Sequence, residues 1–314
     1  MATMALVVAS HRACAGHLTI PGHPERPQRL DAAIAGAALA GGEPIAVEVD
    51  EARALAAVER VHDPGLAPRL RDACARGPGL FDSPDNPISA GTFDAAVAAV
   101  AAALAAVDAV CGERARLAWV AVRPPGHHAL RDRAMGFCFF NNVAVAAEEL
   151  LARGLGPVGI VDFDVHHGNG TQEHFWARDD AYFLSLHHFP YYPGSGSADE
   201  VGVGAGHGFT RNVPLAGGAD DAVYAEALAM GLDDLARTTT PRAWLVSAGF
   251  DAHVEDPLGG MSVSDAGFAE LGRQIGAAAG TAPVVALLEG GYHPEALRRS
   301  VAAFLNGLQV TVTP

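Results

Sequence analysis

The sequence is 314 residues long, half of them hydrophobic and 18% charged, which excludes an intrinsically disordered chain. Because α/β folds commonly exceed about 200 residues without dividing, we expect a single domain over residues 1–314. The formal net charge of −15 argues against a nucleic-acid partner, since proteins that hold phosphate backbones are mostly basic.

Short runs rich in β-branched residues alternate along the chain with longer segments of helical pattern. In chain order, the predicted strands are Ala5–Ala9, Ile45–Val49, Leu117–Val122, Val158–Phe163, Tyr182–Leu186, Ala243–Ser247 and Val284–Leu288. The predicted helices are Pro27–Leu39, Thr92–Val110, Asn142–Arg153, Asp220–Leu235, Asp265–Ala279 and Pro294–Leu305. We expect Thr92 and Asp220 to cap helices at their N-termini and Gly154 to end one.

Several predicted strands are apolar along their length instead of alternating, notably within Gly159–Asp164 and Trp244–Gly249. Strands covered by helices on both faces have this pattern, which predicts a parallel sheet. In such a sheet, ligands and catalytic groups gather at the carboxyl ends of the strands.

The cysteines and the most apolar segment indicate the cellular compartment. Four cysteines lie far apart without a C-x-x-C pair: Cys14, Cys74, Cys111 and Cys138. This spacing predicts reduced, mostly buried thiols. Ala95–Val107 is predicted to be too short and too weakly hydrophobic to span a bilayer. We therefore expect a cytoplasmic protein without a membrane partner.

Polar side chains follow five predicted strands. The segments are Arg123-Pro-Pro-Gly-His-His128, Asp162-Phe-Asp-Val-His-His-Gly-Asn-Gly170, Ser185-Leu-His-His188, Ser247-Ala-Gly-Phe-Asp251 and Glu289-Gly-Gly-Tyr292. Most of these segments include a residue type that can bind a metal or transfer a proton. We therefore expect the five strand ends to contribute to one shared site, rather than to carry polar residues by chance.

Asp164 and His166 are two residues apart, so an extended backbone points both side chains the same way. With Asp251 they would give a divalent metal three protein ligands and leave a position open for water or substrate. Singly, these residues could also cap a loop or start a turn. A two-metal site of the arginase type uses D-x-H-x-D, and here its last position is Gly168. A single metal is therefore the better interpretation.

His127 and His128 follow two prolines and a glycine, a stiff turn that fixes the direction of both rings. Beside a metal they would form a proton-transfer pair, although an isolated pair would more often be a surface feature. Tyr292 can approach closely because Gly290 and Gly291 add no side-chain bulk. Alternatively, Tyr292 could be an ordinary half-buried tyrosine.

These motifs, in this order, resemble the zinc-dependent deacetylases: histone deacetylases, acetylpolyamine amidohydrolases and their bacterial relatives. Gly22-His-Pro-Glu-Arg-Pro27 and Asp256-Pro-Leu-Gly-Gly260 fit the same family, nearer its class II branch. The resemblance covers roughly residues 16–305. It implies the arginase–deacetylase fold, a three-layer αβα domain with a mostly parallel eight-stranded sheet.

By position in the family motifs, the resemblance implies a role for each polar residue. Asp164, His166 and Asp251 would hold one catalytic Zn²⁺, although the sequence does not distinguish zinc from iron(II). His128 would act as general base and then acid, and His127 would position and polarise the water.

Three further residues support this chemistry in the resemblance. Tyr292 would donate to the oxyanion, and Asp162 should orient His127. Asn169 falls where some relatives have an aspartate behind the second histidine. A neutral amide there would raise the basicity of that histidine less than a carboxylate would.

The resemblance also implies one or two structural potassium ions. The first would bind Asp162, the Ser185 hydroxyl and the main chains of Asp164, His166 and Leu186. The second would bind main-chain carbonyls near Phe175 and Arg178.

The residues implied to contact the substrate are Asp85, Gly136, Phe137, Tyr192, Leu258 and Gly290. Tyr192 replaces a phenylalanine of the family and adds a hydroxyl to the substrate tunnel. Leu258 stands where polyamine-specific relatives can carry an acidic residue, which favours a peptide-like or broadly acylated amine. Asp85 either contacts the substrate at the rim of the tunnel or lies in a surface turn.

The resulting hypothesis is an amide-cleaving zinc hydrolase that removes acetyl or related acyl groups from acyl-lysine or similar amines. An acetylpolyamine amidohydrolase is the alternative within enzymes, and a silent relative that binds acyl-lysine is the alternative outside them. The oligomeric state is open, with a homo-oligomer compatible with the sequence.

Overall fold

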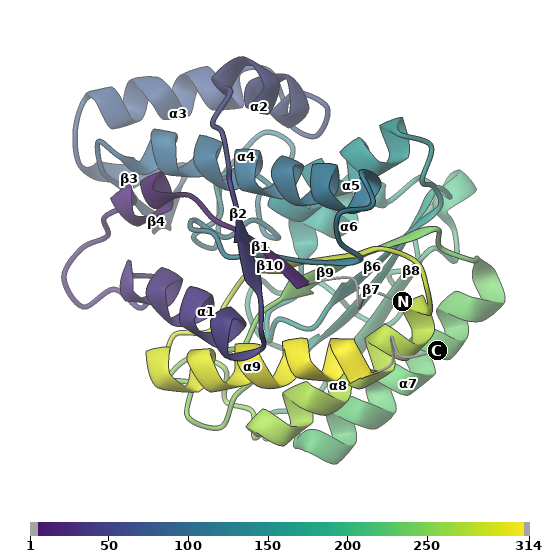
Figure 1. Cartoon of the computed structure of the whole chain (residues 1–314). Coiled ribbons are helices and arrows are strands. Elements are labelled where there is room, and N and C mark those ends of the chain that lie inside the picture. Colours follow the sequence, from purple (N-terminus) through teal and green to yellow (C-terminus); the bar gives the residue numbers. More distant parts are fainter. Residues whose placement is uncertain (1–5, 311–314) are drawn as a thin grey trace.

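The computed structural model describes residues 6–310 and contains a sheet sandwiched between two layers of helices (Figure 1). The sheet strands are β1 (Leu6–Ala9), β2 (Glu43–Ile45), β5 (Leu117–Val120), β6 (Val158–Asp162), β7 (Ala181–His188), β8 (Thr210–Leu215), β9 (Ala243–Ala248) and β10 (Val284–Leu288). Their order is β2-β1-β5-β10-β9-β6-β7-β8, and every neighbouring pair is parallel. This is the predicted αβα fold with an eight-stranded sheet.

Helices cover both faces of the sheet (Figure 1). One layer is formed by α1 (Gln28–Leu39), α7 (Asp221–Thr238), α8 (Asp265–Ala279) and α9 (Pro294–Val310). The other is formed by α4 (Thr92–Cys111), α5 (Asn142–Ala152) and α6 (Asn169–Phe175), with α2 (Glu51–Val58) and α3 (Leu66–Ala75) outside α4. The remaining elements are the 3-10 turns η1 (Arg12–Gly16) and η2 (Gly204–Gly206) and the antiparallel hairpin of β3 (Gly79–Phe81) and β4 (Ser83–Ile88).

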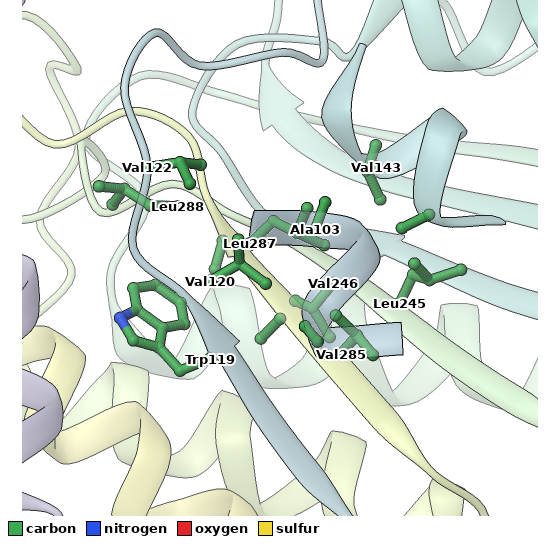
Figure 2. Packing of buried hydrophobic residues seen from close by; sticks show 14 of the residues in the cluster. Ala103, Trp119, Val120, Val122, Val143, Leu245, Val246, Val285, Leu287 and Leu288 are labelled. Atoms are coloured by element: carbon green, nitrogen blue, oxygen red, sulfur yellow. The ribbon is translucent and has the colours of Figure 1, made fainter. Parts of the chain in front are cut away.

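The core lies between the sheet and its two helical layers. All residues of β5, β6, β9 and β10 are buried, which explains why these strands are apolar rather than alternating. Figure 2 shows Ala103 of α4 and Val143 of α5 among strand residues such as Val120, Val246 and Leu287.

Helix α4 corrects one expectation. It is 20 residues long with a mean hydropathy of 1.9, so its length and composition do suffice to cross a membrane. The prediction that this segment is too short and too weakly apolar was wrong in that respect. However, 83% of its apolar window is buried inside the protein, so the helix belongs to the core.

Most predicted elements are present, and the bounds of β10 and α8 agree fully with the prediction. The predicted strand Ile45–Val49 is wrong beyond Ile45, because the edge strand β2 pairs with β1 only over Glu43–Ile45. Strand β8 was not predicted, since Thr210–Leu215 contains a proline and several polar residues, which an edge strand tolerates. Ala5, the first residue of one predicted strand, lies outside the described residues.

The predictions for helix caps and for buried cysteines agree with the structure in part. Asp220 caps α7, with its carboxylate accepting a hydrogen bond from Val223 N at 3.2 Å. Gly91, and not Thr92, is the N-cap of α4; the Thr92 hydroxyl instead accepts a hydrogen bond from Ser89 N. All four cysteines are free, and Cys111 alone among them is half-buried rather than buried.

Candidate active site

Three side chains that could hold a metal ion follow two neighbouring strands. Asp164 and His166 follow β6, and Asp251 follows β9, which pairs directly with β6. His166 Nδ1 lies 3.1 Å from Asp164 Oδ1 and 3.1 Å from Asp251 Oδ2. One donor atom from each residue lies within 4.8 Å of the others.

This donor set fits a cation. His166 Nδ1 can carry only one hydrogen, yet it faces two carboxylates. Asp251 Oδ2 is buried and accepts no hydrogen bond within the described residues. Burial and the neighbouring Asp164 carboxylate raise the pKa of Asp251. A divalent cation at this position would compensate two buried carboxylates and engage the orphaned oxygen.

Glycines make room for the carboxylates. A Cβ on Gly249 would overlap the Asp164 carboxylate, and one on Gly290 would overlap the carboxylates of both Asp251 and Asp164. A Cβ on Gly168 would overlap Asp162 Oδ2. Position 168 therefore has no space for a side chain that could hold a second metal.

The two adjacent histidines have different hydrogen-bond partners. His127 Nδ1 lies 3.0 Å from Asp162 Oδ2, so its N–H donates to that carboxylate. His128 Nδ1 donates to Asn169 Oδ1 at 2.7 Å, which leaves His128 Nε2 as an acceptor. The structure thus brings Asp162 and Asn169 behind the two rings.

The pKa values of His127 and His128 are shifted in opposite directions. Burial disfavours a charged His127 ring, but the carboxylates of Asp162, Asp164 and Glu289 outweigh burial and raise the pKa of His127 to about 10. Burial and the positive neighbours His127 and His166 hold the pKa of His128 well below its ordinary value. His127 is therefore charged and His128 neutral near pH 7 in the metal-free protein.

Glu289 is a part of the site to which the sequence assigned no role. Its Oε2 accepts hydrogen bonds from Gly126 N at 2.6 Å and from His127 N at 3.1 Å. The carboxylate therefore ties the loop that carries the histidines to the loop that carries Tyr292. Burial raises the pKa of Glu289 to about 7. A glutamate immediately after a buried strand was the signal in the sequence.

Tyr292 is buried, with 6% of its surface exposed. Its ring lies edge-on to Phe137, with ring centroids 6.0 Å apart, and the guanidinium carbon of Arg29 lies 4.8 Å from its centroid. Arg29 Nε donates to Gly291 O at 2.6 Å, and Asp256 Oδ2 accepts from Tyr292 N at 2.6 Å. Arg29 was missed because its burial, beside Glu25, is not visible in the local sequence.

A cavity of about 270 Å³ opens onto these groups. It is lined by Asp85, His128, Gly136, Phe137, His166, Tyr192, Leu258 and Tyr292. Five of the six predicted substrate contacts are among them. Gly290 is not: it packs against the metal-binding carboxylates and donates its N–H to Asp164 Oδ2 at 2.7 Å. A larger hollow of about 520 Å³ beside Trp244 contains none of the predicted site residues.

The residues predicted to bind potassium are placed as follows. Asp162 and Ser185 are paired across β6 and β7, and Asp162 Oδ1 accepts from Asp164 N at 3.1 Å. The Ser185 hydroxyl lies 2.9 Å from His187 Nδ1. Near the second predicted position, the Phe175 carbonyl accepts from Arg178 N at 3.1 Å.

A parallel αβα sheet with a carboxylate–imidazole cluster that could hold a metal ion, and with a cavity lined by histidine and tyrosine at the strand ends, is the arrangement of the arginase–deacetylase fold. A family model described as "Histone deacetylase domain" matches residues 23–308, so the chain belongs to the histone deacetylase family.

Individual relatives agree with this assignment. A "Probable deacetylase" of Archaeoglobus fulgidus is 35% identical over 92% of this chain and 81% of its own length. An "Acetylpolyamine amidohydrolase" of Burkholderia pseudomallei is 41% identical over 76% of this chain and 69% of its own length. The solved structure of the "HDA15 HD domain" has a TM-score of 0.90 at 33% identity and covers 100% of this chain and 90% of that one.

Proposed function

We propose that this protein is a zinc-dependent deacetylase that hydrolyses the amide bond of acetyl-lysine or a related acylated amine. The observation that carries the proposal is that one cavity is lined by His166 of the three-residue candidate metal site, by His128 and by the buried Tyr292. Relatives named deacetylase and acetylpolyamine amidohydrolase support the reaction class.

Asp164, His166 and Asp251 would hold the Zn²⁺. When bound, the ion would supply a Lewis acid that polarises the acyl carbonyl and acidifies water. The remaining steps fall to the protein's own side chains.

His128 is suited to move the proton. Its Nδ1–H is committed to Asn169, so Nε2 holds the free lone pair that accepts a proton from the attacking water. The same atom then returns the proton to the leaving amine. His127, whose Nδ1–H donates to Asp162, would position and polarise that water.

Tyr292 would donate its hydroxyl hydrogen to the oxyanion. Because burial and the nearby Asp251 carboxylate keep its pKa well above the ordinary value, the hydroxyl keeps its proton at neutral pH. A preorganised donor of this kind contributes about 3–4 kcal/mol to transition-state stabilisation.

We also propose the supporting features expected from the sequence. Potassium would bind at Asp162, Ser185 and Leu186 with main-chain oxygens of Asp164 and His166, and a second ion near Phe175 and Arg178. The chain would act as one domain over residues 1–314 in the cytoplasm, without nucleic acid, as a monomer or homo-oligomer.

The alternative within the same chemistry is an acetylpolyamine amidohydrolase, which the name of the Burkholderia pseudomallei relative favours. Steady-state rates on an acetyl-lysine peptide, acetylputrescine and acetylspermidine, with the zinc content measured, test the proposal. Turnover that requires zinc supports a deacetylase, and the order of the rates separates the two substrate classes. No turnover of any of them by zinc-loaded protein would favour the silent acyl-lysine-binding relative.

A further inference from the structure

The loop that carries Tyr292 is tied to a second loop by one carboxylate. Tyr292 N donates a hydrogen bond to Asp256 Oδ2 at 2.6 Å, across a sequence separation of 36 residues. Within residues 6–310, that N–H has no other hydrogen-bond partner. Asp256 is half-buried and lies after β9, whereas the buried Tyr292 lies after β10, which pairs with β9. The carboxylate therefore joins the segments that follow two neighbouring strands.

The second oxygen of the same carboxylate holds a residue of the cavity wall. Asp256 Oδ1 accepts from Leu258 N at 2.9 Å, and Leu258 lines the cavity together with Tyr292. Each carboxylate oxygen thus binds the main chain of one cavity-lining residue. Hydrogen bonds to an ionised carboxylate are about twice as strong as those between neutral groups. Asp256 therefore restrains the backbone at two points of the cavity.

The peptide bond between Gly291 and Tyr292 is restrained at both of its polar atoms. Arg29 Nε donates to Gly291 O at 2.6 Å, and Asp256 accepts from the N–H on the other side of the bond. Gly291 has a φ of 111°, a conformation open to glycine and rarely adopted by other residues. Because glycine allows the chain to turn here, these two side chains decide the orientation of the peptide plane, and with it the direction of the tyrosine side chain.

The orientation of this plane affects the transition state more than substrate binding. An oxyanion donor is effective only when its hydroxyl already points to the place where negative charge develops. A misplacement of about 1 Å can lower the rate about a hundredfold. The ground-state substrate does not yet carry this charge, so its affinity depends little on the exact position of the hydroxyl.

We propose that Asp256 is a positioning residue that aims the Tyr292 hydroxyl at the oxyanion by fixing the Gly291–Tyr292 peptide plane. The inference rests on the proposed deacetylase function and adds a residue outside the reacting groups. Asp256 is not among the residues that line the cavity, so it acts through Tyr292 and not by contact with the substrate. An asparagine offers one acceptor oxygen in place of two, so Asp256→Asn leaves either Tyr292 N or Leu258 N facing an amide donor.

The test is a double-mutant cycle of Asp256→Asn and Tyr292→Phe in the zinc-loaded protein. The substrate is the one that the wild type turns over fastest among an acetyl-lysine peptide, acetylputrescine and acetylspermidine. We expect Asp256→Asn alone to lower kcat about tenfold to a hundredfold, with KM changed less than about threefold. In the Tyr292→Phe background the same substitution should lower kcat at most about twofold, because no hydroxyl is left to misplace.

Asp221→Asn is the matched control. Asp221 is also half-buried, and its carboxylate likewise ties a distant main-chain N–H, that of Ser264 at 2.7 Å, but neither residue lines the cavity. Its variant should change kcat less than about twofold, and by the same factor in both backgrounds. The rise in Tm on addition of zinc, measured for every variant, shows that the protein is folded and binds the metal.

Two kinds of failure are distinguishable. A wild-type kcat in Asp256→Asn, an equal loss in both backgrounds, or a loss confined to KM would overturn the positioning role and leave the deacetylase function intact. Absence of wild-type turnover on all three substrates would instead contradict the proposed function and this inference with it. If Asp256→Asn does not fold, Asp256→Glu takes its place. It keeps both acceptor oxygens but moves them by one methylene, and its loss of kcat should depend on Tyr292 in the same way.

Discussion

Tyr292 is the residue at which the proposed mechanism predicts a separate effect on binding and on turnover. It lines the cavity, and its ring is held by Phe137 and Arg29. Phenylalanine would keep these ring contacts and lose only the donor. An interaction made only in the transition state affects kcat more than KM.

We therefore expect Tyr292→Phe to lower kcat at least about a hundredfold with KM little changed. Steady-state kinetics on the best substrate would measure the loss. Tyr224→Phe is a suitable control, because the buried Tyr224 hydroxyl has no hydrogen-bond partner in the described structure. Near-normal turnover of Tyr292→Phe would rule out its oxyanion role.

A second prediction for a single residue concerns Glu289 and the dependence of protein stability on pH. Burial raises its pKa from 4.5 to about 7 in the folded protein. A carboxyl whose folded pKa is raised stabilises the fold fully below pH 4.5, and this contribution is lost as the pH rises through about 7. Asp162, whose pKa burial raises to about 6, acts in the same direction.

Between pH 4.5 and about 7, ionisation of Glu289 should thus lower the free energy of unfolding of the metal-free protein by about 3 kcal/mol. Buried histidines such as His17 and His62, whose pKa values are lowered to about 4, contribute in the opposite direction, so the test compares each variant with the wild type. Glu289→Gln should remove the Glu289 contribution, because an amide does not ionise, and its free energy of unfolding should therefore rise relative to that of the wild type as the pH increases. Urea unfolding with a chelator at several pH values would measure it, with Glu295→Gln, a 68% exposed residue, as the control. An unchanged pH slope in Glu289→Gln would be inconsistent with this account.

At the scale of elements, α4 shows how composition decides packing. Most of its residues are buried, and its many alanines let the helix fit between the sheet, α2 and α5. Ala103 is fully buried among strand residues (Figure 2), whereas Ala105 on the same helix is half-buried. The two positions therefore test packing in one helix.

Ala103→Leu should lower the free energy of unfolding by about 1–3 kcal/mol, because a close-packed core cannot absorb three extra carbons without strain. Ala105→Leu should cost less, since part of its added side chain can reach solvent. Chemical denaturation of both variants would measure the difference. Equal losses would indicate that α4 is packed less tightly than its burial implies.

The predictability of elements followed their burial. The central strands β6, β9 and β10 were predicted from apolar runs, because helices cover both faces of the sheet and bury every residue of these strands. The edge strands β2 and β8 were misplaced or missed, because one-sided pairing leaves a weak sequence pattern. The short helix α6 was also missed, since seven residues are too few for a clear period.

For the whole molecule, the metal site joins the segments after β6 and β9 in the middle of the sheet. Binding of Zn²⁺ to the folded state alone should stabilise it by about 2.7 kcal/mol when free zinc is a hundred times its Kd. We expect added zinc to raise Tm by several degrees and a chelator to reverse the shift, as measured by calorimetry. Asp251→Asn should abolish most of the shift, and a full shift in this variant would show that zinc binds elsewhere.

The sequence by itself determined the parallel αβα fold and the family, and it supplied the candidate site residues, because buried strands and strand-end motifs are local patterns. Only the tertiary structure decided that Glu289 holds the His127 backbone, that Gly290 borders the Asp164 and Asp251 carboxylates, and that Tyr192 donates to Asp85. These contacts join segments up to 162 residues apart. Residue type and spacing do not specify them, since they depend on strand register and on the paths of the loops.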